Sequence, residues 1–93
     1  MKYEDLKANG TKILEKDKIA GGGYSGSKEY WECNSIIYMH ESNTNTMTYT
    51  GKTYTEIICS VDEMDYKTAN IYLSNEEDIK IMLDYCEKKR GNK

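Results

Sequence analysis

Carboxylates are the side chains of this chain whose number and spacing could support chemistry. From Glu56 to Glu87 nine carboxylates stand against two lysines, so this segment carries a net charge of −7 in a 93-residue protein whose total is −3. Like charges concentrated in this way form a negative surface once the chain is compact. Such a surface attracts basic partners and repels bare nucleic acid. The acidic segment therefore predicts a partner with a basic surface.

Acid–base catalysis is one alternative for these carboxylates, and the pattern argues against it. Such catalysis needs two carboxyl groups in different environments. Asp62 and Asp65 lie in a predicted turn, and Glu76 and Glu77 lie at a predicted helix start, so all four are expected to be exposed. The Asp62-x-x-Asp65 spacing also lacks the length and the glycine of a calcium loop. We expect Glu76 and Glu77 to stabilise the helix start, because the helix dipole favours anions there.

The predicted partner surface combines the acidic turn with aromatic side chains. No helix start explains the acidic turn, so we expect four of its residues to contribute more to binding than the helix-start carboxylates: Asp62, Glu63, Asp65 and Tyr66. Tyrosine and tryptophan are enriched at protein interfaces. Three aromatic residues around a glycine-rich segment are therefore a second candidate: Tyr24, Tyr30 and Trp31. The sequence leaves open which group is the interface, and whether Tyr only replaces Phe at the edge of the core.

Two further patterns resemble binding motifs without the context those motifs need. Gly21, Gly23 and Gly26 satisfy G-x-G-x-x-G. The dinucleotide fingerprint places its glycines between a strand and a helix, whereas a β-type sequence follows here. Lysines in the N-terminal third alternate with acids, so no basic face for nucleic acid is expected. We predict no cofactor and no direct nucleic-acid binding.

The single histidine, His40, and the three cysteines could in principle form a zinc site or a catalytic pair. Structural zinc sites usually bring their ligands in close pairs such as C-x₂-C, whereas Cys33, Cys59 and Cys86 are widely spaced. Three cysteines cannot all pair within one chain, and Cys59 and Cys86 lie in apolar patterns typical of a core. We expect unpaired thiols, no metal site, no catalytic residue and no enzymatic activity.

Local patterns predict the elements that position these residues. A short helix is expected at Lys2 to Ala8. Residues favourable to strands, rich in Tyr, Ile and Thr, occur in four segments: Glu29 to His40, Met47 to Thr50, Thr53 to Val61 and Ala69 to Leu73. Thr11 to Ala20 fits either a short strand or a helical turn.

Turn-forming residues separate these segments. The predicted loops and turns are Gly21 to Ser27, Glu41 to Asn45 and Asp62 to Lys67. Gly51-Lys52 is placed for a two-residue turn with glycine first. The residues on either side of it form either a tight hairpin or one long strand with a bulge.

The C-terminal segment Ser74 to Lys89 has the pattern of an amphipathic helix. Ser74 and Glu77 have the spacing of a capping box. Apolar residues recur at i, i+3, i+4 and i+7 and form one stripe: Ile79, Met82, Leu83 and Cys86. Basic residues occupy the last turn, and Gly91 follows as a stop.

Together these elements predict an α+β fold. We expect residues 1–93 to form one domain, because a chain of 93 residues suits a single small core. Its small antiparallel sheet would have three or four strands, with the C-terminal amphipathic helix packed on one face and a short N-terminal helix. The sequence contains no apolar run long enough to span a membrane and no apolar stretch after Met1 typical of a secretion signal. The expected location is therefore the cytoplasm, and the A/T-rich codons of the favoured residues Lys, Ile, Tyr and Asn indicate that of a bacterial host cell.

In its small size, acidity, codon-related bias towards Lys, Ile, Tyr and Asn, and helix–sheet–helix layout, the chain resembles small phage-encoded inhibitors of bacterial defence systems, in particular anti-CRISPR proteins. This resemblance implies a mechanism in which carboxylates stand in for phosphates and the inhibitor fills the nucleic-acid or PAM-reading groove of a nuclease or CRISPR effector. It implies a protein partner and a monomer or small homo-oligomer. The alternative is an oligomeric protein that binds a small ligand or a signal nucleotide beside the glycine-rich segment.

Overall fold

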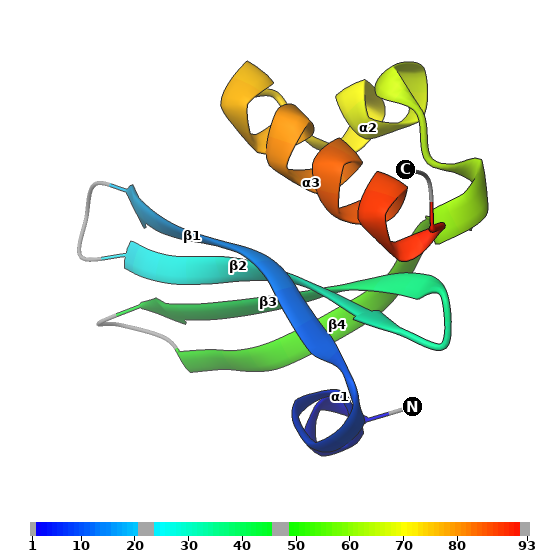
Figure 1. Ribbon diagram of the computed structural model, residues 1–93. Helices are drawn as coiled ribbons and strands as arrows, with labels where there is room; N and C mark the ends of the chain where they lie inside the picture. The colour runs from blue at the N-terminus through cyan, green and yellow to red at the C-terminus, as the bar shows by residue number, and fades with distance from the viewer. Residues whose placement is uncertain (1, 21–23, 46–48, 92–93) are drawn as a thin grey trace.

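An antiparallel sheet with helices on both faces is the centre of the fold (Figure 1). The computed structural model describes residues 2–20, 24–45 and 49–91. Within these ranges the elements are, in chain order, α1 (Tyr3–Asn9), β1 (Thr11–Ala20), β2 (Tyr24–Cys33), β3 (Ile36–Asn45), β4 (Tyr49–Ser60), the 3₁₀ helix η1 (Val61–Glu63), α2 (Tyr66–Tyr72) and α3 (Glu76–Lys89). The strands pair in the order β1-β2-β3-β4. The predicted α+β class, with a short N-terminal helix and a C-terminal helix, is confirmed.

Alternation along the strands divides the buried side chains between two cores. Helices α2 and α3 cover one face of the sheet (Figure 1), where Ile37 packs with Met82 and Cys86 of α3. Helix α1 lies against the opposite face, where Leu6 packs with Trp31. Leu6, Ile37 and Cys86 are all 0% exposed. The sheet is therefore the layer that both cores share.

Strands β2 and β3 are joined by a two-residue turn inside the segment Glu29 to His40, which the sequence presents as one β-type run. The φ angles of Asn34 and Ser35 are 55° and 67°, the left-handed values that a type I′ hairpin turn needs at both central residues. The carboxylate of Glu32 accepts a hydrogen bond from the Ser35 N–H at 2.8 Å. This bond holds the turn in place although neither central residue is glycine.

The strands extend further than the local composition indicates. The predicted break at Glu41 to Asn45 is wrong, because β3 runs to Asn45. The predicted loop Gly21 to Ser27 is wrong for its last residues, since β2 begins at Tyr24; residues 21–23 lie outside the described residues. Here β3 pairs with β2 on one side and β4 on the other. Ladder hydrogen bonds on both sides outweigh the turn preference of small polar residues.

Two alternatives that the sequence leaves open are decided by the structure. Thr11–Ala20 is a strand, with Ile13 as the extra residue where the pairing of β1 with β2 shifts register. Tyr49–Ser60 is one long strand, in which Gly51 and Lys52 pair with β3 instead of forming a turn.

The predicted strand Ala69 to Leu73 is wrong, because Tyr66–Tyr72 form helix α2. Asp65 caps this helix by accepting a hydrogen bond from the Thr68 N–H at 2.8 Å. Ile71 and Leu73 suggest a strand by their two-residue spacing, yet Ile71 is 68% and Leu73 only 6% exposed. The buried pair is Ala69 and Leu73, which has the i, i+4 spacing of a helix.

Helix α3 confirms the predicted apolar stripe, and its N-cap lies one residue later than predicted. Asn75, rather than Ser74, is the N-cap, and its side-chain oxygen accepts hydrogen bonds from the N–H groups of Glu77 and Asp78 at 2.8 and 3.3 Å. Of the stripe, three residues are at most 2% exposed and the fourth, Leu83, is partly buried. The helix ends before Gly91, whose φ of 82° is the left-handed value that favours glycine.

Candidate partner-binding site

A groove between helices α2 and α3 has a volume of about 500 Å³. Tyr66 of α2 and Ile79 and Leu83 of α3 line it. Ile79 is 2% exposed and forms the floor, whereas Tyr66 is 54% exposed. A large aromatic side chain half open to solvent above an apolar floor is the kind of feature that anchors a protein partner.

Carboxylates surround the apolar part of the groove. Glu76, Asp84 and Glu87 of α3 line it together with one cation, Lys80. Glu76, Lys80 and Asp84 follow one another at intervals of four residues, and Glu87 continues the row of Ile79 and Leu83. Such spacing places side chains on one side of a helix, one turn apart. The groove therefore has an apolar floor and an acidic rim.

Two N-caps hold the ends of this groove. Asp65 fixes the first turn of α2, so that Tyr66 is the first helical residue, and Asn75 does the same for Glu76 in α3. The backbone and side-chain hydrogen bonds from Thr68 hold the pKa of Asp65 below its usual value, and the charge of Lys67 adds to this effect. Because the lowered pKa keeps Asp65 ionised at neutral pH, this residue caps the helix and also contributes to the negative surface.

The residues of the predicted acidic turn do not share one role. Tyr66 lines the groove. Asp62 and Glu63 are exposed in η1 but are not among the groove-lining residues. Asp65 has the capping role that the sequence analysis assigned only to the start of the C-terminal helix. Of the predicted group, only Tyr66 therefore lines the groove.

Two of the three residues in the second predicted group are buried. Tyr30 is 2% and Trp31 8% exposed, and they belong to the larger and the smaller core respectively. The Tyr30 hydroxyl donates to the backbone oxygen of Tyr72 at 3.4 Å, and Trp31 Nε1 donates to Glu29 Oε1 at 2.9 Å. These two rings are thus structural, which corrects their assignment to the partner surface. The side chain of Tyr24 lies outside what the structure describes.

Three carboxylates of the groove were missed by sequence reasoning: Glu76, Asp84 and Glu87. Glu76 was assigned to the helix start alone, and the other two were counted only in the net charge. Their spacing along α3 is visible in the sequence. Their position next to Tyr66 cannot be seen in the sequence. Tyr66 belongs to α2, and the sequence pattern of that segment indicates a turn and a strand instead of a helix.

The cysteines and His40 are packed within the fold. Cys33 and Cys86 are buried, Cys59 is partly buried, and all three are free thiols. Burial raises the pKa of Cys86 to about 11, so its thiol stays protonated at neutral pH. The His40 ring stacks on Tyr3 with ring centroids 3.6 Å apart. In residues 2–20, 24–45 and 49–91, no three side chains of His, Cys, Asp or Glu are grouped so as to hold a metal ion.

None of the helices in the described part of the chain is both long and apolar enough to cross a membrane. Comparisons with protein-family models, with curated proteins and with solved structures find no match.

Proposed function

We propose that this protein is a non-enzymatic binding protein that docks its acidic helical layer on a basic surface of another protein. The α2–α3 groove is the observation that carries the proposal. From Val61 to Glu87 eight carboxylates stand against two lysines, and three of these carboxylates surround an apolar floor. A partner segment that presents an apolar residue between lysines or arginines complements such a groove in shape and charge.

A nucleic-acid-binding enzyme is the partner class that this chemistry fits best. Sites that hold nucleic acid carry lysine and arginine side chains for the phosphates together with aromatic or apolar contacts for the bases. Carboxylates on a rigid helix beside Tyr66 can occupy such a site in place of nucleic acid. The resemblance to anti-CRISPR proteins supports the same assignment, an inhibitor that fills the basic groove of a nuclease or CRISPR effector.

The charged and the aromatic residues of the groove are expected to affect different steps of binding. Charges at an interface mainly steer association, whereas a desolvated aromatic residue slows dissociation. Reversal of Asp84 and Glu87 to lysine is therefore expected to slow association, and Tyr66→Ala to speed dissociation. Salt should weaken binding, since exposed charges are screened over about 8–10 Å at physiological ionic strength.

The test is quantitative affinity capture from a bacterial lysate at low and at physiological salt, followed by binding kinetics with the recovered protein. The Asp84→Lys/Glu87→Lys variant is compared with Asp62→Lys/Glu63→Lys, which makes the same charge change in η1 outside the groove. We expect a nucleic-acid-binding protein to be recovered by the wild type and retained better by the η1 variant than by the groove variant. Equal recovery by all three proteins, without dependence on salt, would show that the acidic layer is only a solvated surface.

A further inference from the structure

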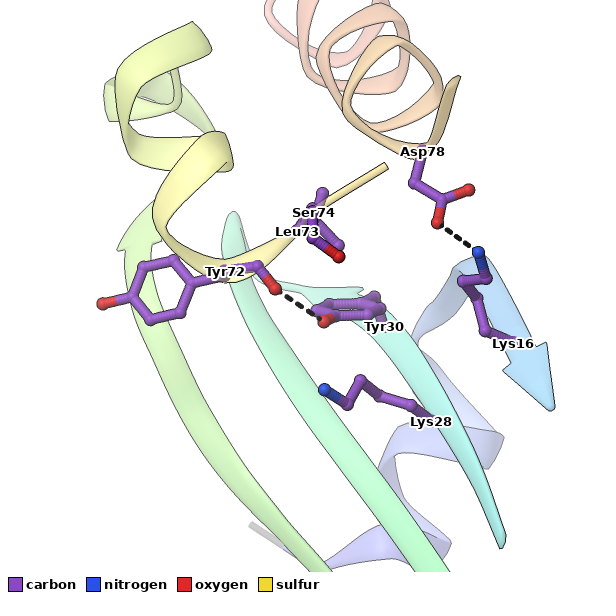
Figure 2. A pocket seen from close by; sticks show the side chains of 7 residues that line it. All are labelled: Lys16, Lys28, Tyr30, Tyr72, Leu73, Ser74 and Asp78. Carbon is purple, nitrogen blue, oxygen red and sulfur yellow. Dashed lines mark hydrogen bonds and ion pairs between the residues drawn. The ribbon is translucent and has the colours of Figure 1, made fainter. Parts of the chain in front are cut away.

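A second cavity lies where the sheet meets the segment between α2 and α3, and it differs in character from the acidic groove. Its volume is about 380 Å³, within the range of cavities that hold small ligands. Strands β1 and β2 supply one wall, and the end of α2 and the start of α3 supply the other (Figure 2). The polar lining residues are Lys16, Lys28, Tyr30, Tyr72, Ser74 and Asp78.

Two lysines face each other across the strands of this wall. Lys16 and Lys28 are direct partners in the pairing of β1 with β2, and like charges in such a position destabilise a sheet. Lys16 is compensated by Asp78, because its Nζ lies 2.8 Å from Asp78 Oδ2 and Asp78 is only 8% exposed. Lys28 has an opposite charge across the other ladder, because Glu41 is its direct partner in the pairing of β2 with β3.

Lys28 is the second cation of the cavity. Within the described residues it forms no ion pair. Figure 2 shows its side chain pointing away from the Lys16–Asp78 pair. Glu41, its partner on β3, is partly buried and does not line the cavity. The cavity thus combines one ion-paired lysine with one ammonium group whose cross-strand carboxylate lies outside the cavity lining.

Hydroxyl groups add hydrogen-bond donors beside Lys28. The bond from Tyr30 to the Tyr72 carbonyl is 3.4 Å long, beyond the usual range for hydroxyl donors, so a better acceptor can displace it. Burial raises the pKa of Tyr30 to about 12, and Glu41 and Asp78 add to this shift. The hydroxyl therefore remains a donor at neutral pH. Ser74, exposed at the rim, supplies another.

We infer that this cavity binds a small organic anion, a phosphate- or carboxylate-bearing molecule no larger than a mononucleotide, whose anionic group contacts Lys28 with the hydroxyls of Tyr30 and Ser74. A cation and two hydroxyl donors provide the charge-assisted hydrogen bonds that such groups take. The Lys16–Asp78 pair closes the cavity on the other side. This site is independent of the α2–α3 groove and does not rest on the protein–protein function proposed for it.

The test is a titration of the full chain followed by amide chemical shifts, with inorganic phosphate, AMP, citrate and the uncharged nucleoside adenosine as probes. We expect at least one of the anions to give saturable shifts at Lys28, Tyr30 and Ser74, and adenosine to give none. Comparing the shifts caused by phosphate and AMP with those caused by citrate shows whether the cavity prefers a phosphate or a carboxylate group. Lys28→Gln should weaken the binding by at least about 10-fold, whereas Lys67→Gln, the same charge change on exposed α2, should leave it unchanged. Absence of saturable shifts with all three anions, or equal weakening in both variants, would overturn the proposal.

Thermal unfolding without ligand gives a second readout. Lys28→Gln removes both the repulsion from Lys16 and the attraction to Glu41 across the strands, so if Lys28 is retained for a ligand the Tm should stay within about 2 °C of the wild type. The charge-preserving variant Lys28→Arg should keep saturable binding. A Tm for Lys28→Gln several degrees below the wild type would show that Lys28 stabilises the sheet itself, and would count against the proposed site.

Discussion

Glu29 shows how a single carboxylate joins two elements of this fold. Its Oε1 accepts hydrogen bonds from the Tyr3 hydroxyl and from Trp31 Nε1, both at 2.9 Å. Tyr3 belongs to α1 and Trp31 to β2, so the carboxylate ties the N-terminal helix to the sheet. Partial burial alone would raise the pKa of Glu29. The hydrogen bonds from Trp31 and Tyr3 and the charge of Lys12 outweigh burial, and the pKa is lowered.

This lowered pKa predicts a pH-dependent contribution of Glu29 to stability. A carboxylate with a lower pKa in the folded state stabilises the protein above its unfolded pKa, and that contribution is lost as the pH falls through the folded value. Glu29→Gln should therefore lower the free energy of unfolding at pH 7 by about 1–2 kcal/mol, because the glutamine oxygen still accepts both hydrogen bonds but lacks the charge that strengthens them. The deficit should shrink between about pH 5 and pH 3. Urea unfolding at several pH values measures both effects.

Glu15→Gln is the matched control. Glu15 pairs with Lys12 at 2.9 Å, but the side chains are 39% (Lys12) and 47% (Glu15) exposed. An exposed pair contributes only about 0–1 kcal/mol, so this variant should stay close to the wild type at every pH. A Glu29→Gln deficit that is the same at pH 3 and pH 7 would mean that the lost contact is packing and not charge.

At the scale of elements, the β2–β3 turn offers the clearest prediction. Ser35 holds a φ of 67°, a left-handed conformation that costs a residue with a Cβ roughly 1–2 kcal/mol. Glycine adopts it freely but loses more entropy on folding. Ser35→Gly should therefore stabilise the protein by about 0.5–1 kcal/mol, whereas Ser35→Ala should give no gain. Thermal melts of the two variants test this, and a destabilised Ser35→Gly would show that the Ser35 side chain itself supports the turn.

The elements differ in how far the sequence predicts them. The stripe Ile79, Met82, Leu83 and Cys86 and the stop at Gly91 identify α3 because cap, period and terminus agree over four turns. Helix α2 escaped prediction because Ile71 and Leu73, two positions apart, give the end of this segment the apolar spacing of a strand. The extension of β3 to Asn45 was not predicted either. Its small polar residues do not favour a strand, and the strand is stabilised by hydrogen bonds to β2 and β4 on either side.

The candidate groove shows where local reasoning ends. The acidic segment and Tyr66 are visible in the sequence, and both remain part of the proposal. Tyr66 and Glu87 lie 21 positions apart along the chain, and they line one groove only because α2 and α3 pack side by side. Conversely, Tyr30 and Trp31 are of residue types enriched at interfaces, yet the structure buries both in the core. A pattern that alternates along a strand does not reveal that helices cover both faces.

At the scale of the whole molecule, the helical layer carries most of the negative charge and the sheet is nearly balanced. The cavity with Lys28 lies at the boundary between these layers, while the α2–α3 groove lies within the helical layer. The two proposed binding sites, which differ in charge, should therefore be separable by mutation. Asp84→Lys/Glu87→Lys should leave anion binding at Lys28 unimpaired, and Lys28→Gln should leave protein docking unimpaired.

Because the two cores share one sheet, we expect the molecule to unfold as one cooperative unit. Trp31 is the only tryptophan and lies in the smaller core, so its fluorescence reports on the α1 side. Far-UV circular dichroism is dominated by α3 on the other side. In urea the two signals should give coincident transitions, as is usual for single domains of this size.

Leu6→Ala tests this coupling from the smaller core. Leu6 is 0% exposed, and removing a fully buried leucine side chain costs about 2–5 kcal/mol. If the sheet transmits the loss, fluorescence and circular dichroism should shift to the same lower urea midpoint. If instead the fluorescence transition moves alone and α3 unfolds at the wild-type midpoint, the two faces unfold separately, and the prediction of one domain over residues 1–93 is wrong.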